Sequence, residues 1–237
     1  MFNIFKKKVN DDNDHGEIVV LENDSVRNDG YERLRDNILY LNTDGNNKVI
    51  QIESSVAHEG KTTVLCNLAV SLGLTDKKVV VVDLDFRRPK THRVFGLSKD
   101  TGIAEYILKD VKLEKIIKKT KYKNVDLITR GAEVYNSSLV FVSEKFREFI
   151  KDLREQYDYV LLDCAPVLQV SDYIHISKIS DGVLFVVAHA KTSKSLVADA
   201  IKELKKNDAN IFGCVFSMYD KKKDKGYYHF TGGYSGY

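Results

Sequence analysis

The feature that most constrains the fold is a repeated alternation of short apolar runs with amphipathic segments. Six runs have the length of strands, and several are uninterrupted stretches of Val, Ile and Leu. They lie at 49–54, 79–85, 125–130, 159–165, 182–189 and 211–217. Helical patterns lie at 62–74, 102–119 (with a break), 139–156, 171–179 and 193–206. Because continuous apolar runs are typical of parallel strands buried on both faces, the alternation predicts an α/β fold with a doubly wound, mainly parallel sheet and helices on both faces.

The two ends of the chain differ in character from this central domain, which is expected over 25–218. Residues 1–24 are polar and of mixed charge, which predicts a flexible or loosely docked arm. A helix is predicted over 25–41. Its apolar face holds Tyr31, Leu34, Ile38 and Leu41. Residues 219–237 contain five tyrosines and no hydrophobic period, and this composition predicts a disordered tail.

Charge and cysteine usage exclude several classes of protein. The net charge of +3 is too small to indicate nucleic acid as a partner. No apolar run reaches the roughly 18 residues of a membrane-spanning helix, and the N-terminus lacks the apolar region of a secretory signal. The cysteines Cys66, Cys164 and Cys214 are far apart, each within an apolar segment, which predicts small core residues in a reducing compartment. We therefore expect a cytoplasmic protein.

A loop typical of phosphate binding follows the first strand-like run and opens the next helix. The order of strand, tight loop and Gly-Lys-Thr is the context that a P-loop requires. Backbone N–H groups of the loop and the helix N-terminus form a positive site for phosphates, Lys61 can reach the terminal phosphates, and the Thr62 hydroxyl can bind Mg²⁺. His58 stands inside the loop, where small residues are commoner. The expected nucleotide-binding residues are Glu59, Gly60, Lys61, Thr62 and Thr63.

Three aspartates end apolar runs of the predicted sheet. Asp83 and Asp85 follow four valines, and their spacing of two predicts that they point to the same side of a strand. Asp163 closes the run 159–162, as in a Walker B strand whose aspartate holds the metal or its water. A carboxylate at the end of an apolar strand is costly unless it is paired or bound to a cation. Since ligands bind at the carboxyl ends of parallel strands, these side chains are expected to converge with the phosphate loop.

Together these motifs resemble those of a known family. The Gly-Lys-Thr-Thr of residues 60–63, the segment DLDFRRP at 83–89 and the segment YVLLDCAPV at 159–167 are similar to motifs of the bacterial tyrosine kinases (BY-kinases) of exopolysaccharide and capsule synthesis. The likeness covers residues 25–237 and includes the tyrosine-rich C-terminal cluster that this family autophosphorylates. It implies a P-loop fold, ATP and Mg²⁺ as cofactors, and transfer of the γ-phosphoryl group to tyrosine.

The resemblance also implies a role for each matching residue. Lys61, Asp83 and Asp85 become the catalytic residues, and Asp83 orients or deprotonates the acceptor tyrosine. The metal ligands implied are Thr62, Asp85 and Asp163. The acceptors implied are Tyr227, Tyr228, Tyr234 and Tyr237.

The short form of the chain resembles the Gram-positive arrangement, in which a separate membrane protein supplies an activating segment. The implied partners are this membrane-embedded activator or polysaccharide co-polymerase, the chain's own tail as substrate, and further copies of the chain in a homo-oligomer. The implied location is the cytoplasm, at the inner face of the cell membrane through that partner.

Two other functions remain open on the sequence. An ATPase of the partitioning or division-site type (ParA/MinD) has a similar loop, but it carries an additional early lysine where this chain has Val56. A catalytically weak nucleotide-binding scaffold of the polysaccharide machinery is the second alternative. Detection of phosphotyrosine separates the kinase from both.

Overall fold

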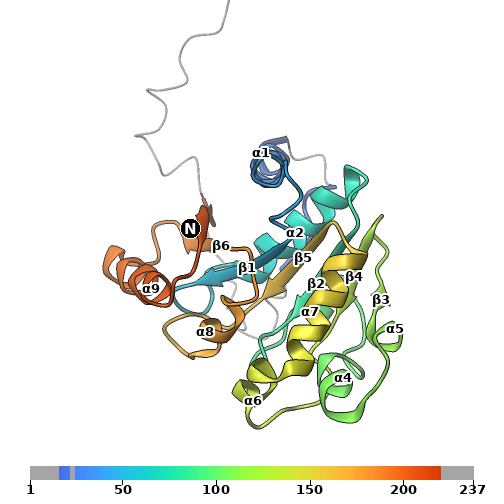
Figure 1. Cartoon of the computed structure of the whole chain (residues 1–237). Coiled ribbons are helices and arrows are strands. Elements are labelled where there is room, and N and C mark those ends of the chain that lie inside the picture. Colours follow the sequence, from blue (N-terminus) through green and yellow to red (C-terminus); the bar gives the residue numbers. More distant parts are fainter. Residues whose placement is uncertain (1–15, 22–24, 220–237) are drawn as a thin grey trace, which may run out of the picture.

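The computed structural model describes residues 16–21 and 25–219, and within them the chain forms a sheet flanked by helices (Figure 1). The strands of this described part are β1 (Val49–Ser54), β2 (Val79–Asp83), β3 (Lys118–Lys119), β4 (Val125–Ile128), β5 (Tyr159–Asp163), β6 (Gly182–Ala188) and β7 (Ile211–Ser217). The helices are α1 (Ser25–Leu41), α2 (Lys61–Leu74), α3 (Thr91–Phe95), α4 (Ile103–Lys109), α5 (Leu113–Ile116), α6 (Ser137–Val142), α7 (Glu144–Gln156), α8 (Asp172–Ile176) and α9 (Lys194–Lys206).

The strands are arranged in the order β3-β4-β2-β5-β1-β6-β7. Neighbouring strands are parallel, except that β3 runs antiparallel to β4. Every residue of β1, β2, β5 and β6 is buried, which explains their nearly uninterrupted apolar sequences. The predicted doubly wound, mainly parallel α/β architecture is confirmed.

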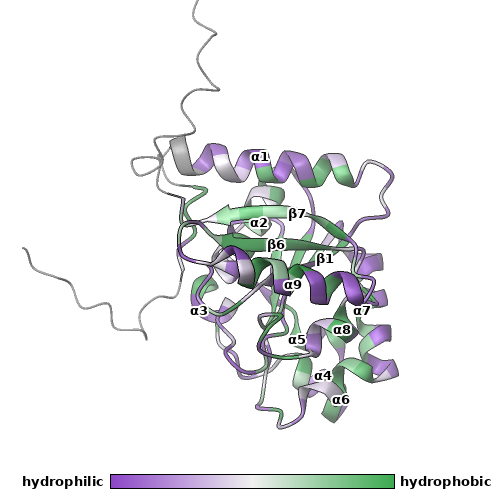
Figure 2. Cartoon of the chain, turned by 90° about the vertical axis from the view of Figure 1, so that its left-hand side faces the viewer, coloured by the Kyte–Doolittle hydropathy of each residue, from purple (hydrophilic) through white to green (hydrophobic). Residues whose placement is uncertain are grey.

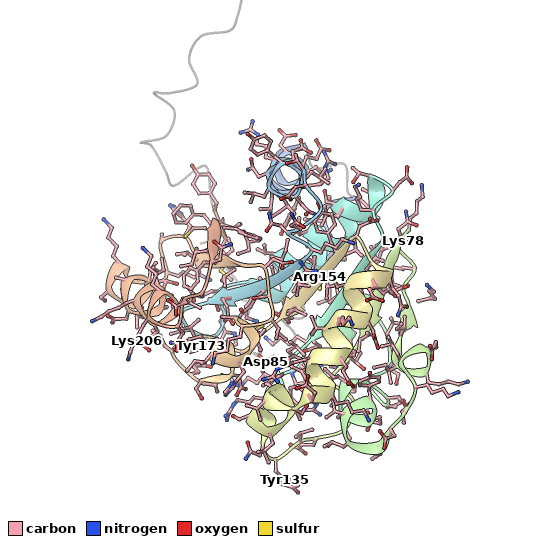
Figure 3. The ribbon with its side chains drawn as sticks, in the orientation of Figure 1. Lys78, Asp85, Tyr135, Arg154, Tyr173 and Lys206 are labelled. Atoms are coloured by element: carbon pink, nitrogen blue, oxygen red, sulfur yellow. The ribbon has the colours of Figure 1, made fainter. Side chains whose placement is uncertain are left out.

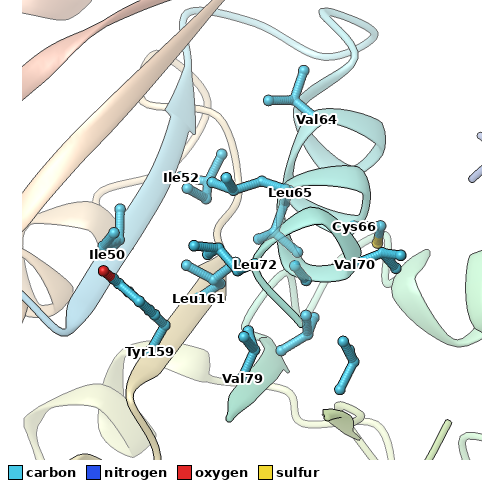
Figure 4. Packing of buried hydrophobic residues seen from close by; sticks show 14 of the residues in the cluster. Ile50, Ile52, Val64, Leu65, Cys66, Val70, Leu72, Val79, Tyr159 and Leu161 are labelled. Carbon is cyan, nitrogen blue, oxygen red and sulfur yellow. The ribbon is translucent and has the colours of Figure 1, made fainter. Parts of the chain in front are cut away.

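One face of the sheet is covered by α2, with α1 lying outside it (Figure 1). Successive side chains of a strand point to opposite faces, so that Ile50 and Ile52 of β1 share this side with Leu161 of β5. These residues pack with Leu65 and Leu72 of α2 (Figure 4). The first turn of α2 is thereby held over the carboxyl ends of the central strands.

The other face of the sheet is covered by helices that follow β2, among them α4, α5 and α7. Val160 and Leu162 of β5 pack there with Phe146 and Phe149 of α7. A third cluster joins β6 to α9 through residues such as Phe185. Figure 2 shows the hydrophobic strand β6 beside α9, in which hydrophilic and hydrophobic residues alternate.

The predicted helices are confirmed in outline, but two of them are divided. The pattern at 102–119 contains α4 and α5 and then ends in β3, a strand that the helical pattern did not indicate. The pattern at 139–156 breaks at Ser143, whose backbone is extended and whose hydroxyl accepts a hydrogen bond from the Phe146 N–H (3.1 Å) at the start of α7. The short helix α3 was not predicted, because five residues are too few to show a period.

One prediction of burial is wrong. Cys214 is exposed, because β7 forms an edge of the sheet, whereas Cys66 and Cys164 are buried as expected. On the predicted apolar face of α1, Leu41 is 37% exposed at the end of the helix. Ile38, one turn earlier, is buried against α2.

Part of the segment expected as an arm is docked onto α2. The Asn67 side chain accepts hydrogen bonds from the N–H groups of Val19 (2.8 Å) and Val20 (3.2 Å) and donates one to the carbonyl of Glu17 (2.7 Å). Both valines are 7% exposed. The rest of the expected arm, 1–15 and 22–24, lies outside the described residues, as does the tail from 220. Among the helices that the structure describes, none is long and apolar enough to cross a bilayer.

Two Gly→Ala substitutions are expected to change the free energy of unfolding in opposite directions, because the space around the two glycines differs. A Cβ at Gly73 would lie 2.4 Å from the Lys123 carbonyl oxygen, whereas a Cβ at Gly30 of α1 meets nothing within 4 Å. We expect Gly73→Ala to lower the free energy of unfolding by about 1–3 kcal/mol, and Gly30→Ala to raise it by about 0.5–1 kcal/mol. Urea denaturation measures both, and equal effects of the two substitutions would contradict this packing.

Candidate active site

The phosphate loop connects the end of β1 with the first turn of α2. Gly60, the residue before α2, has a φ of 79°, in the left-handed region that glycine adopts without steric cost. His58 is also left-handed, with a φ of 65°. For a residue with a Cβ this conformation costs about 1–2 kcal/mol. The loop thus stores backbone strain, which is characteristic of ligand-binding loops and persists only where the surroundings enforce it.

Asp163, at the carboxyl end of β5, binds the first two residues of α2. The ammonium group of Lys61 lies 2.7 Å from Asp163 Oδ1, and the Thr62 hydroxyl donates to Asp163 Oδ2 at 2.8 Å. Lys61 is 7% exposed and Asp163 is 1% exposed. Both carboxylate oxygens are therefore occupied, and the predicted phosphate-binding lysine and metal-binding residues lie in direct contact.

The charge of Lys61 is stabilised by its neighbours. Burial by itself lowers the pKa of the ammonium group, but the carboxylates of Asp163 and Asp85 outweigh burial and raise the pKa above its ordinary value. Lys61 is therefore protonated throughout the physiological range and available to neutralise a phosphate.

Asp83 lies beside Asp163 in the parallel pair formed by β2 and β5. It is fully buried, and its Oδ2 accepts hydrogen bonds from the Thr91 hydroxyl (2.6 Å) and the Thr91 N–H (3.1 Å). Burial raises the pKa of Asp83 to about 7, and the charges of Asp163 and Asp85 add to the shift. A carboxyl group with a pKa near neutrality is suited to exchange protons at physiological pH. Thr91 had not been singled out, since nothing in its local sequence links it to Asp83.

Asp85 is placed by a turn rather than by the strand. The alternation predicted for Asp83 and Asp85 does not apply, because β2 ends at Asp83. Asp85 lies beyond the strand end (Figure 3). Its Oδ1 accepts hydrogen bonds from the N–H groups of Arg87 (3.1 Å) and Arg88 (2.8 Å). The negative charge of Asp85 contributes to the raised pKa of Lys61.

Glu59, expected as a nucleotide-binding residue, uses its side chain within the protein. It is 2% exposed, and its Oε2 accepts a hydrogen bond from the Val56 N–H at 2.8 Å. Only the backbone of Glu59 is thus left to face a phosphate. Thr63 lies in the first turn of α2, and a Cβ on Gly16 would come within 2.5 Å of its hydroxyl, so the docked N-terminal segment passes alongside it.

The residues expected to hold Mg²⁺ fit the chemistry of that ion. Hydroxyl and carboxylate oxygens are its preferred protein ligands, and Mg²⁺ in nucleotide sites takes one or two of them together with phosphates and waters. Within the described residues, no group of three His, Cys, Asp or Glu side chains is placed to hold a metal. The Thr62–Asp163 pair offers one hydroxyl and one carboxylate, the oxygen ligands that Mg²⁺ takes in nucleotide sites.

A buried glutamate that the sequence analysis did not single out lies directly before the loop. Glu53 of β1 is fully buried; its Oε1 accepts a hydrogen bond from the Gln51 amide (2.6 Å), and its Oε2 has no partner within the described part of the chain. Burial raises the pKa of Glu53 to about 8. An acidic residue inside an apolar strand was the available signal in the sequence.

Comparisons with known proteins assign the fold to a family. The model of the AAA domain family AAA_31 matches residues 47–211, which include the loop and all three aspartates. The chain belongs to the AAA_31 family. The tyrosine-protein kinase YwqD of Bacillus subtilis (strain 168) is 29% identical over 213 residues, covering 89% of this chain and 90% of YwqD. The resemblance to bacterial tyrosine kinases is confirmed.

Solved structures of similar fold place this AAA_31 chain among the P-loop NTPases, as predicted. The crystal structure of the chimerical protein CapA2B2 matches with a TM-score of 0.82 and 27% identity, over 87% of this chain and 94% of CapA2B2. The septum site-determining protein MinD of Pyrococcus horikoshii OT3, solved with Mg-ADP, matches with a TM-score of 0.63 and 29% identity, over 74% of this chain and 72% of MinD.

Removing Lys61 tests the buried ion pair in the absence of nucleotide. Lys61→Met leaves Asp163 buried with one partner, and breaking such a pair typically costs about 3–5 kcal/mol. Lys119→Met is the control, because the ion pair of Lys119 with Asp126 has a lysine side chain that is 84% exposed and is worth about 0–1 kcal/mol. Urea denaturation of both variants is expected to show this difference, and similar losses of stability would refute the assignment.

Substituting Glu53 tests its raised pKa. The folded pKa of about 8 lies above the ordinary value of 4.5, so the contribution of Glu53 to stability is fully present below pH 4.5 and is lost as pH rises through 8. We therefore expect the wild type to lose stability relative to Glu53→Gln between pH 5 and 9 in urea denaturation. Asp44→Asn is the control, because Asp44 is exposed and its pKa is lowered. A constant difference between wild type and Glu53→Gln across this range would contradict the shift.

Proposed function

We propose that this protein is an ATP-dependent tyrosine kinase that phosphorylates tyrosines of its own C-terminal segment. The observation that carries the proposal is the convergence of the phosphate loop after β1, Asp163 at the end of β5 and Asp83 at the end of β2. These strands are neighbours in the order β2-β5-β1, so that their carboxyl ends form one site. Relatives named tyrosine-protein kinases support the same activity.

The loop and the start of α2 supply the groups that a nucleotide triphosphate needs. The loop N–H groups and the N-terminus of α2 offer hydrogen bonds to phosphate oxygens, and the permanently charged Lys61 offsets their negative charge. To reach a phosphate, Lys61 exchanges its contact with Asp163 for one with the nucleotide. Mg²⁺, held through Thr62, Asp85 and Asp163, neutralises charge on the terminal phosphates when bound. Transfer of a phosphoryl group depends mainly on such positioning and charge neutralisation.

Asp83 is assigned to the acceptor tyrosine. A tyrosine hydroxyl has a pKa near 10, and a carboxylate that accepts its proton late in the transfer assists the reaction. In the described structure Asp83 Oδ2 accepts both hydrogen bonds from Thr91 and Oδ1 accepts one from the Asp85 N–H (3.3 Å), so that the bonds from Thr91 open when the acceptor binds. Thr91 is thus a positioning residue for Asp83.

The acceptors proposed are Tyr227, Tyr228, Tyr234 and Tyr237, which lie outside the described residues. Since each phosphate adds about −1.5 to −2 charges, successive phosphorylation makes this segment strongly anionic. We assign the kinase to the control of capsular or exopolysaccharide synthesis, activated by a membrane-embedded partner at the inner face of the membrane. Similarity to the CapA2B2 structure and to the putative tyrosine-protein kinase CapB of Staphylococcus aureus supports this setting.

Incubation with γ-labelled ATP, Mg²⁺ and the activating segment tests the function. We expect phosphotyrosine in the wild type and none in Lys61→Met, while Asp83→Asn retains nucleotide binding and loses about 10²–10⁴-fold in rate, the usual contribution of a general base. ATP hydrolysis without phosphotyrosine would favour a ParA/MinD-type ATPase. Nucleotide binding with neither reaction would favour a scaffold.

A further inference from the structure

The carboxylate of Glu59 connects the phosphate loop by hydrogen bonds to the end of β6 and to the segment between β6 and α9. Besides the bond from the Val56 N–H, it accepts hydrogen bonds from the Thr192 hydroxyl and from the Ala188 N–H (3.5 Å). Ala188 is the last residue of β6, and Thr192 lies two residues before α9. These contacts join groups about 130 residues apart in sequence.

Ser217, at the end of β7, binds the same part of the loop from another strand. Its hydroxyl donates to the carbonyl oxygen of Glu59, and a Cβ on Gly60 would lie 3.2 Å from the Ser217 side chain. The Ser217 carbonyl in turn accepts a hydrogen bond from the His189 N–H at 3.0 Å. The end of β7 is therefore packed directly against the loop.

These contacts fix the conformation of the phosphate loop. A non-glycine residue in the left-handed region persists where the surrounding structure fixes it, and His58 is such a residue in this loop. A glutamate in a phosphate loop also repels phosphates if it faces them. The hydroxyl of Thr192 and the N–H groups of Val56 and Ala188 hold the carboxylate inside the protein instead.

We propose that Glu59, Thr192 and Ser217 form a clamp that holds the phosphate loop in its nucleotide-binding conformation and couples it to the end of β7. Thr192 and Ser217 are positioning residues, because they act on the nucleotide through Glu59. The tyrosine-rich segment begins two residues after Ser217, so that nucleotide binding and the start of this segment influence one another. The inference deepens the proposed function and rests on its nucleotide-binding step.

The affinity of the full chain for a fluorescent ADP analogue with Mg²⁺ tests the clamp. Thr192→Val keeps the size of the side chain and removes the hydroxyl bound to a carboxylate, so we expect about tenfold weaker binding, while Thr192→Ser restores wild-type affinity. In a double-mutant cycle, Glu59→Gln with Thr192→Val is expected to lose no more affinity than the larger single effect. Fully additive losses would overturn the clamp.

Ser193→Ala is the control that distinguishes an effect of Thr192 on nucleotide binding from a general effect on stability. The Ser193 hydroxyl accepts a hydrogen bond from the Leu196 N–H (3.3 Å) at the start of α9 and has no bond to Glu59. Its removal is expected to lower the melting temperature and to leave ADP affinity unchanged. Equal affinity of wild type and Thr192→Val, or an equal loss in Ser193→Ala, would overturn the clamp alone. Failure of the wild type to bind ADP would overturn the proposed function as well.

Hydrogen exchange tests the coupling to β7. In the wild type, ADP is expected to slow amide exchange in the loop and also over 187–192 and 214–219. In Thr192→Val the effect over 187–192 is expected to disappear, and in Ser217→Ala the effect over 214–219 is expected to disappear. Slowing that stays confined to the loop in the wild type would overturn the coupling.

Discussion

The arrangement of the site depends on the buried contact of Asp163 with Lys61 and Thr62. An isolated charge at this depth would be costly, so the end of β5 and the start of α2 each stabilise a group that the other requires. The same contact brings an ammonium group, a hydroxyl and a carboxylate together at one place. In the proposed function, these three groups are the ones that a nucleotide with Mg²⁺ takes up, so that its binding replaces one set of charge contacts with another.

The order of the sheet explains why other residues join this contact. Because β5 lies between β1 and β2, the phosphate loop after β1 and Asp83 at the end of β2 flank Asp163 on either side. On the far side of β1, β6 and β7 bring Ala188 and Ser217 to the loop. The phosphate loop is thus supported by the strands next to it as well as by its own helix.

Two acidic groups near the site are held in states that an exposed carboxylate would not adopt. Asp83 is buried and accepts hydrogen bonds from Thr91, and Glu53 is buried with one oxygen that has no partner among the described residues. Both have raised pKa values because burial penalises their charged forms. The raised pKa of Asp83 suits its carboxyl group to exchange a proton near neutral pH, at the position proposed for the acceptor tyrosine. In the described conformation, the residues proposed to bind the nucleotide, Lys61 and Thr62, are therefore bonded to Asp163. The proposed base, Asp83, is bonded to Thr91.

The sequence by itself determined the fold class, since strands buried on both faces must be apolar throughout and helices between them must be amphipathic. It also singled out Lys61, Thr62 and the three aspartates as candidate site residues, because a phosphate loop and strand-end carboxylates are local patterns. Only the tertiary structure decided the partners of Asp83 and Glu59, the turn that places Asp85, and the short elements α3 and β3. Thr91, Thr192 and Ser217 have no local signal, because their roles come from contacts between segments that meet only when the sheet is assembled.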